Sequence, residues 1–186
     1  DIIQKQQSVV FTGITEKPVL ALLQDFSAPV KLEFSYSDHD LLILMQHSKR
    51  EFSRWDAAQT LINKYIRQNV ESVQQGKEMT LPSALLEVLA AILVDQKLDK
   101  SLIAEIMRIP SETSMAELFD AIDIDAIHQV KYFIEKTIAT QLHDLFIDVY
   151  QQSKTKHYDL NQKDIAKRDL VSVCLYYIGL NDNESD

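Results

Sequence analysis

The chain has 186 residues, 46% of them hydrophobic and 25% charged, so it can bury a sizeable core and lacks the composition of a disordered protein. Its formal net charge of -9 argues against nucleic acid as the main partner, because phosphate binding needs a clustered basic surface. Only 3 glycines and 4 prolines are present, and an all-β protein needs more turn residues than that. The composition therefore favours helix.

Cysteine usage and hydropathy bear on the compartment. Cys174 is the only cysteine, which excludes an intrachain disulfide and a zinc knot built from thiolates. A reducing, cytoplasmic compartment is therefore expected. No apolar run is long enough to cross a bilayer, and residues 1–7 lack the pattern of a signal peptide, so we expect no membrane contact. The missing initial Met predicts a piece of a longer chain.

The first elements expected along the chain are strands. Val30–Tyr36 alternates apolar and polar side chains, the period of a strand with one buried face. Ser8–Phe11 and Pro18–Leu23 are two shorter candidates. Because two or three strands rarely stand alone, residues 1–36 are expected to be the end of a β-sandwich domain whose other strands lie upstream.

From residue 37 onward the apolar residues follow helical spacing. Ser37 or Asp38 can cap a helix over Leu41–Met45. An apolar stripe from Trp55 to Val73, interrupted by Asn69, predicts a second helix that ends at Gly76 and holds Trp55 in the core. Residues 84–94 are apolar on nearly every side, and such a helix is normally enclosed on all sides.

The remaining helices are predicted from caps and apolar stripes. Asp99 is a candidate cap for the helix over Leu102–Met107, and Ser114 with Glu117 forms a candidate capping box. The stripe from Ile127 to Val149 predicts one continuous helix of about six turns. Asn161 with Asp164 marks the start of a last helix, whose inward stripe includes Cys174 and Tyr177. The fold class expected for residues 37–186 is an irregular array of helices, similar to an α-solenoid.

Histidine spacing bears on a metal site. A helical zinc site of the HExxH type needs two histidines four residues apart, with a glutamate as general base. The histidines are His39, His47, His128, His143 and His157. No two are four apart and none is followed by Glu, so no zinc site within this chain is predicted.

Other candidate groups have simpler interpretations. Asp120, Asp123 and Asp125 lack the turn glycine of a calcium loop, and capping of the helix that follows explains them, as it explains Asp38 and Asp40. Cys174 lies in an apolar stripe, which predicts an inert buried thiol. Gly13, Gly76 and Gly179 are too far apart for a phosphate-binding loop.

Basic residues gather at two places, with acids interspersed in both. They are Lys49, Arg50 and Arg54, and then Lys163, Lys167 and Arg168. Mixed charge of this kind is typical of a solvated helix face, so neither place is predicted to bind nucleic acid.

Four stretches, in this order, resemble the bacterial members of the zinc-dependent aminopeptidase N family. They are FTGITEKPVLALLQDFSAPVKLEF (11–34), EFSRWDAAQ (51–59), MAELFDAID (115–123) and DIAKRDL (164–170). The chain departs from the family pattern at Leu20-Ala21, where the family tends to have Pro-Ser, and at Gln24, where it tends to have Arg. The resemblance implies the end of the β-sandwich domain, residues 1–36, and the first part of the helical C-terminal domain, residues 37–186.

In that family the helical domain closes over the catalytic domain and helps to enclose the substrate chamber. The resemblance thus implies zinc in a parent enzyme that removes N-terminal residues from peptides, with the remainder of that enzyme as partner. The HExxH and GAMEN-type motifs of the family are absent from this sequence. No catalytic or metal residue is therefore assigned, and the substrate-binding residues are unknown. The alternative is an independent helical scaffold that binds peptides or protein partners. An HExxH word upstream of Asp1 would discriminate between the two.

Overall fold

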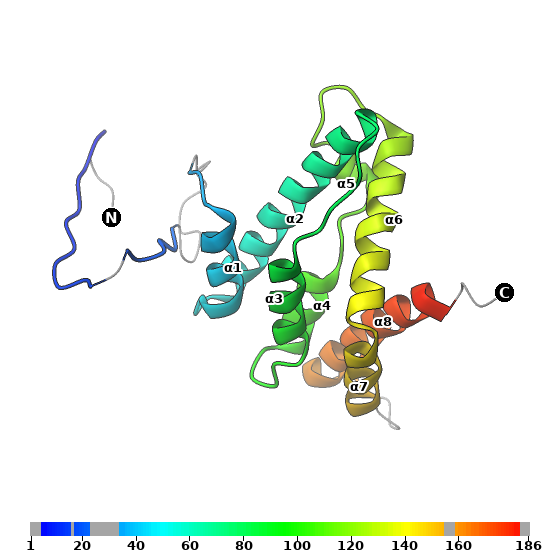
Figure 1. Cartoon of the computed structure of the whole chain (residues 1–186). Coiled ribbons are helices and arrows are strands. Elements are labelled where there is room, and N and C mark those ends of the chain that lie inside the picture. Colours follow the sequence, from blue (N-terminus) through cyan, green and yellow to red (C-terminus); the bar gives the residue numbers. More distant parts are fainter. Residues whose placement is uncertain (1–4, 16, 23–33, 155–158, 183–186) are drawn as a thin grey trace.

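The structure is a computed structural model that describes residues 5–15, 17–22, 34–154 and 159–182 (Figure 1). The described residues from 38 onward are mainly helical, which confirms the mainly helical prediction. The helices are α1 (Asp38–His47), α2 (Glu51–Gln74), α3 (Ser83–Leu93), α4 (Lys100–Met107), α5 (Glu112–Ala116), α6 (Ile124–Gln141), α7 (His143–Ser153) and α8 (Gln162–Asp182). None of these helices combines the length and apolar character that crossing a bilayer requires.

The helices form an array in which neighbours along the chain pack on one another (Figure 1). α1 packs on α2, α5 on α6, and α7 on α8. The long helices α2 and α6 also contact each other, and α8 crosses near the C-terminal end of α6. The short helix α4 packs against α2, α3 and α8, so it joins the two halves of the array.

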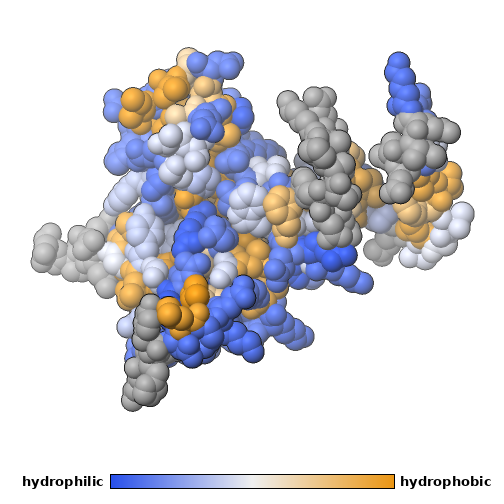
Figure 2. All heavy atoms as spheres, turned by 180° about the vertical axis from the view of Figure 1, so that it is seen from behind, coloured by the Kyte–Doolittle hydropathy of each residue, from blue (hydrophilic) through white to orange (hydrophobic). Residues whose placement is uncertain are grey.

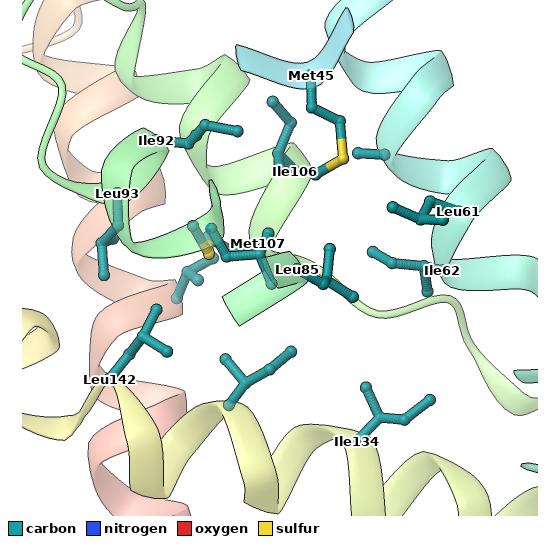
Figure 3. Packing of buried hydrophobic residues seen from close by; sticks show 14 of the residues in the cluster. Met45, Leu61, Ile62, Leu85, Ile92, Leu93, Ile106, Met107, Ile134 and Leu142 are labelled. Carbon is teal, nitrogen blue, oxygen red and sulfur yellow. The ribbon is translucent and has the colours of Figure 1, made fainter. Parts of the chain in front are cut away.

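The core lies around α4 (Figure 3). Five of the eight residues of α4 are buried: Leu102, Ile103, Ala104, Ile106 and Met107. Figure 3 shows side chains from α1, α2, α3 and α6 pointing toward Ile106 and Met107. Since burial of apolar surface is the main favourable term in folding, this short helix is held by packing rather than by its own helix propensity. On the outer surface, hydrophobic residues are scattered in separate patches between hydrophilic ones in the view from behind (Figure 2).

Local capping chemistry explains where several helices begin. Ser37 forms a capping box with Asp40, and Asp99 accepts from the amides of Ser101 and Leu102. Before α8, the side chain of Asn161 accepts from the Asp164 amide at 2.9 Å. All three starts agree with the sequence predictions. Gly76 adopts a φ of 65°, a conformation that favours glycine, directly after α2.

The capping box expected at Ser114 and Glu117 is wrong. Ser111 is the cap of α5 and accepts from the Ser114 amide at 3.2 Å. The helix therefore starts earlier than the pattern suggested, and Glu117 lies at its C-terminal end. Both serines are followed by good helix-forming residues, so local sequence alone did not decide between them.

The single long helix expected from Ile127 to Val149 is two helices. At Leu142 the backbone adopts φ -110° and ψ 15°, which ends α6, and α7 starts at the next residue. Leu142, Phe146 and Val149 are all buried, so the apolar stripe continues through the break. Because neither Gly nor Pro marks this position, hydrophobic spacing could not show it.

The prediction that α3 is enclosed on all sides is wrong, and the prediction that Trp55 is buried holds only in part, since Trp55 packs against the core but is incompletely covered. α3 buries Leu85, Leu89, Ile92 and Leu93, but Val94 at its end is 41% exposed. Trp55 is only half-buried and packs its ring against Phe52, with ring centroids 5.4 Å apart. One side of each helix thus faces outward among the described residues.

No strand forms among the described residues. Val9, Val10 and Phe11 are 65%, 83% and 65% exposed and have no regular structure, contrary to the prediction for Ser8–Phe11. The described residues of the other candidates, 18–22 and 34–36, are not in strands either, and 23–33 lie outside the described residues. A strand needs neighbours that satisfy its backbone groups, and the described residues of this region offer no neighbouring strand.

Candidate functional site

The predicted histidines do not meet. His39 and His47 are exposed near the two ends of α1, and His128 on α6 contacts Glu112 through its Nδ1 at 2.9 Å. His143 is half-buried at the start of α7, and its Nδ1 has no hydrogen-bond partner in the part of the chain that the structure describes. His157 lies outside the described residues. Among the described residues, no three His, Cys, Asp or Glu side chains come together as a metal site would require.

Of the acidic residues Asp120, Asp123 and Asp125, only Asp123 has the capping role that was expected. Asp123 caps α6 by accepting from the Ala126 amide at 3.0 Å, and this hydrogen bond lowers the pKa of the Asp123 carboxyl. Asp120 and Asp125 are exposed. Asp40 also has a capping role, as part of the box with Ser37.

Asp38 departs from the capping interpretation. It accepts from the Tyr65 hydroxyl at 2.8 Å and forms an ion pair with Lys64, so it ties α1 to α2. The hydrogen bond from Lys64 is the main reason that the pKa of Asp38 is lowered. Burial, followed by the hydrogen bond to Asp38, raises the pKa of Tyr65. These groups therefore link α1 to α2.

Cys174 and the basic residues have structural environments. Cys174 is buried, as its place in an apolar stripe predicted, and burial raises the pKa of its thiol to about 12. Arg54 donates from Nε to the Ser48 carbonyl at 2.7 Å, and Arg168 donates to the Asp159 carbonyl at the same distance. Both guanidinium groups therefore hold the connection that precedes their own helix, and because both residues are half-buried the prediction of a solvated face holds only in part.

A buried polar group that the sequence interpretation did not single out lies on α6. Glu135 is 6% exposed, although its neighbours Ile134 and Ile138 belong to the core. Lys131, one turn earlier, donates from Nζ to Glu135 Oε1 at 2.9 Å. Burial first, and then a hydrogen bond to Glu135, raise the pKa of Tyr176 on α8. A carboxylate is thus held inside by one ammonium group and one phenol.

This carboxylate lies in the wall of a hollow between helices. The hollow has a volume of about 560 Å³ and lies between the α4–α5 connection, α6 and α8. Its floor includes Tyr177, whose hydroxyl donates to the Met107 carbonyl at 2.6 Å and whose ring stacks on Phe146. Arg108 stands at its edge, paired with Glu105 and Asp169. The hydrogen bond with Asp169 is the main cause of the raised pKa of Arg108.

The arrangement around Glu135 can hold a small polar group but is not built for nucleophilic chemistry. The two serine hydroxyls on its lining are already engaged: Ser111 caps α5, and Ser172 donates to the Arg168 carbonyl at 2.9 Å. Neither has an adjacent histidine base among the lining residues. A signal was present in the sequence, since Lys131 and Glu135 are spaced as an i, i+4 pair inside an apolar stripe. Tyr176 could not be found in that way.

Two family descriptions cover the chain. "Domain of unknown function (DUF3458_C) ARM repeats" matches residues 38–186, and "Domain of unknown function (DUF3458) Ig-like fold" matches residues 1–35. The chain belongs to the first of these families, and its helical array agrees with a helical repeat domain.

Three known proteins carry the comparison further, and each is named as an aminopeptidase. Aminopeptidase N of Escherichia coli K12 is 43% identical over 98% of this chain, and that of Haemophilus influenzae is 38% identical over 96%. A crystal structure of Legionella pneumophila aminopeptidase A in complex with aspartic acid superposes with a TM-score of 0.80 at 29% identity, over 94% of this chain. The chain spans about a fifth of each relative's length, 21%, 20% and 21%.

Proposed function

We propose that this chain is the non-catalytic C-terminal region of a zinc-dependent aminopeptidase, an enzyme that removes N-terminal amino acids from peptides. The observation that carries the proposal is the 43% identity to aminopeptidase N over 98% of the chain. Because the chain corresponds to only 21% of that relative, we assign zinc binding and catalysis to the rest of a longer parent protein. No catalytic, metal-binding or substrate-binding residue is assigned within residues 1–186.

The proposed division is the end of a β-sandwich at residues 1–36 and the first part of a helical domain at 37–186. The two family matches, which meet between residues 35 and 38, support this boundary. We propose that the helical part packs on the catalytic domain and helps to enclose the substrate chamber, and that the parent is cytoplasmic. Identity spread over almost the whole chain favours this role over an independent scaffold, which would need no relation to a peptidase.

The first test is metal content and turnover. The chain alone should bind no stoichiometric zinc and should not hydrolyse an alanyl chromogenic substrate, because a catalytic zinc needs three protein ligands and an open position for water. The parent, with its upstream region, should gain both properties together. One zinc per purified chain, or turnover by the chain above that of a His128→Ala/His143→Ala variant, would contradict the proposal. So would an upstream sequence that lacks an HExxH word.

The second test concerns the chamber. In the parent protein, deletion of residues 38–186 should leave the zinc in place but open the chamber. The truncated enzyme should then lose the preference of the intact enzyme for short peptides over an unfolded protein substrate. Unchanged size discrimination, measured by release of N-terminal amino acids from both substrates, would show that this region does not enclose the site.

A further inference from the structure

A second concave surface lies on the opposite side of Arg108 from the Glu135 hollow, along α2 and α4. Two adjacent hollows, of about 490 and 450 Å³, share Trp55 and Glu105 in their walls. We call this surface the Trp55 groove and define it by Glu51, Phe52, Trp55, Glu105, Arg108 and Glu117. It is separate from the groups that link α1 to α2 and from the Glu135 hollow, with which it shares the edge formed by Arg108 and Ile109.

Aromatic rings form one wall of the groove. Phe52 is 47% exposed, and its ring packs against the half-buried ring of Trp55. Both lie on the first two turns of α2, whose later turns bury Leu61, Ile62 and Ile66 completely. Aromatic side chains left partly in water are a common feature of binding surfaces, because they offer a large apolar face at low entropic cost.

Acidic groups dominate the rest of the groove. Four carboxylates line the two hollows, those of Glu51, Asp99, Glu105 and Glu117, against the single guanidinium of Arg108. Arg108 is already committed, since it pairs with both Glu105 and Asp169. Glu105 pairs with Arg108 and Asp99 caps α4, so Glu51 and Glu117 are the carboxylates that offer their charge to a cation entering the groove.

We propose that the Trp55 groove docks an extended peptide segment that carries arginine beside apolar residues. A guanidinium group can lie flat on the Trp55 indole while it pairs with Glu51, and an apolar neighbour can contact Phe52 and Leu102. Two adjacent hollows with one shared aromatic wall fit successive side chains of one peptide. The groove requires neither zinc nor a catalytic domain, so this inference is independent of the proposed aminopeptidase role.

The experiment uses the whole chain and a labelled pentapeptide that alternates arginine with leucine, capped at both ends. Anisotropy of the label reports binding, and emission of Trp55 reports its place, because this is the only tryptophan in the chain. We expect saturable binding with a change in Trp55 emission, weakened at least about threefold by half-molar salt, which screens exposed charges. The same peptide with glutamate in place of arginine should not bind.

Two variants and a matched control locate the site. Glu51→Gln should weaken binding about two- to fivefold, as expected for one exposed charge, and Phe52→Ala at least about fivefold. Glu87→Gln removes the same charge from an exposed position on α3 that lines neither hollow. This variant should bind the peptide like the unmutated chain. Circular dichroism verifies that each variant is folded. Absence of saturation, equal binding of the glutamate peptide, or equal loss in Glu87→Gln would overturn the proposal.

Discussion

Asn69 on α2 and Glu135 on α6 are both polar residues buried in an apolar helix face, 2% and 6% exposed. The partners of Asn69 are backbone groups: it donates to the Tyr65 and Thr80 carbonyls at 2.8 and 2.9 Å and accepts from the Thr80 amide at 2.7 Å. The partners of Glu135 are the side chains of Lys131 and Tyr176. The first residue closes a turn, whereas the second keeps the wall of a hollow polar.

The difference follows from charge. A neutral amide can satisfy its donors and acceptors within one connection of the chain, so Asn69 fixes the segment between α2 and α3 against α2. A carboxylate needs a cation and remains costly to bury even when paired. The α2 region therefore uses its buried polar group for structure, and the comparison predicts a larger stability loss there than at Glu135.

The largest effect is expected from Asn69→Ala. This change leaves the Thr80 backbone groups without their partner and should lower the free energy of unfolding by about 2–3 kcal/mol. Urea unfolding followed by circular dichroism measures it. Asn63→Ala, on the same helix but only half-buried, is the matched control and should change stability by less than about 0.5 kcal/mol. Equal losses would mean that the hydrogen bonds of Asn69 are not what holds the turn.

A smaller effect, and one that can be reversed, is expected at Glu135. Glu135→Leu should cost about 2 kcal/mol, because it leaves the Lys131 ammonium group without its partner in a partly buried site. The double variant Lys131→Met/Glu135→Leu should have a free energy of unfolding within about 1 kcal/mol of that of the unmutated chain, since a buried ion pair can be replaced by apolar side chains at little cost. If the double variant is less stable than the single one, Glu135 stabilises the fold as Asn69 does. The proposed difference between the two regions would then be wrong.

The smallest effect is expected from Asp38, which extends the α2 network through Tyr65. Its folded pKa lies below the ordinary aspartate value of 3.8, chiefly because of the Lys64 hydrogen bond, so its stabilising contribution is present above that value. The contribution is lost as the pH falls through the folded pKa. With its side chain 36% exposed, we expect at most about 1 kcal/mol.

Urea titrations above and below pH 3.8 test this sign. Asp38→Asn should reduce the stability of the chain near neutral pH but leave it unchanged in strong acid. Asp148→Asn, an exposed position on α7, serves as control. If Asp38→Asn still lowers the free energy of unfolding at the lowest pH, the packing of this side chain, and not its charge, stabilises the fold.

Part of the candidate site was visible in the sequence. The i, i+4 spacing of Lys131 and Glu135 within the stripe of Ile134 and Ile138 could have indicated an ion pair on a buried face, although our sequence interpretation did not single it out. Tyr176 lies far along the chain on another helix, and no local pattern links it to Glu135. Trp55 was expected in the core from its spacing, but it lies at the edge of α2, where its neighbours cover it only partly.

The sequence by itself determined the features that depend on neighbouring residues. Helix starts at Ser37, Asp99 and Asn161 follow from side chains that reach amides one turn away, and the apolar stripes follow from helical period. The sequence also showed the family resemblance, because that resemblance depends on the order of short motifs along the chain.

Tertiary structure decided what depends on partners distant in the chain. The choice of Ser111 over Ser114, the break at Leu142 and the exposed side of α3 all depend on which helices pack together. The same holds for the hollow beside Glu135 and for the Trp55 groove, whose walls come from separate helices. Period and propensity describe one helix at a time, whereas burial is a property of the assembled array.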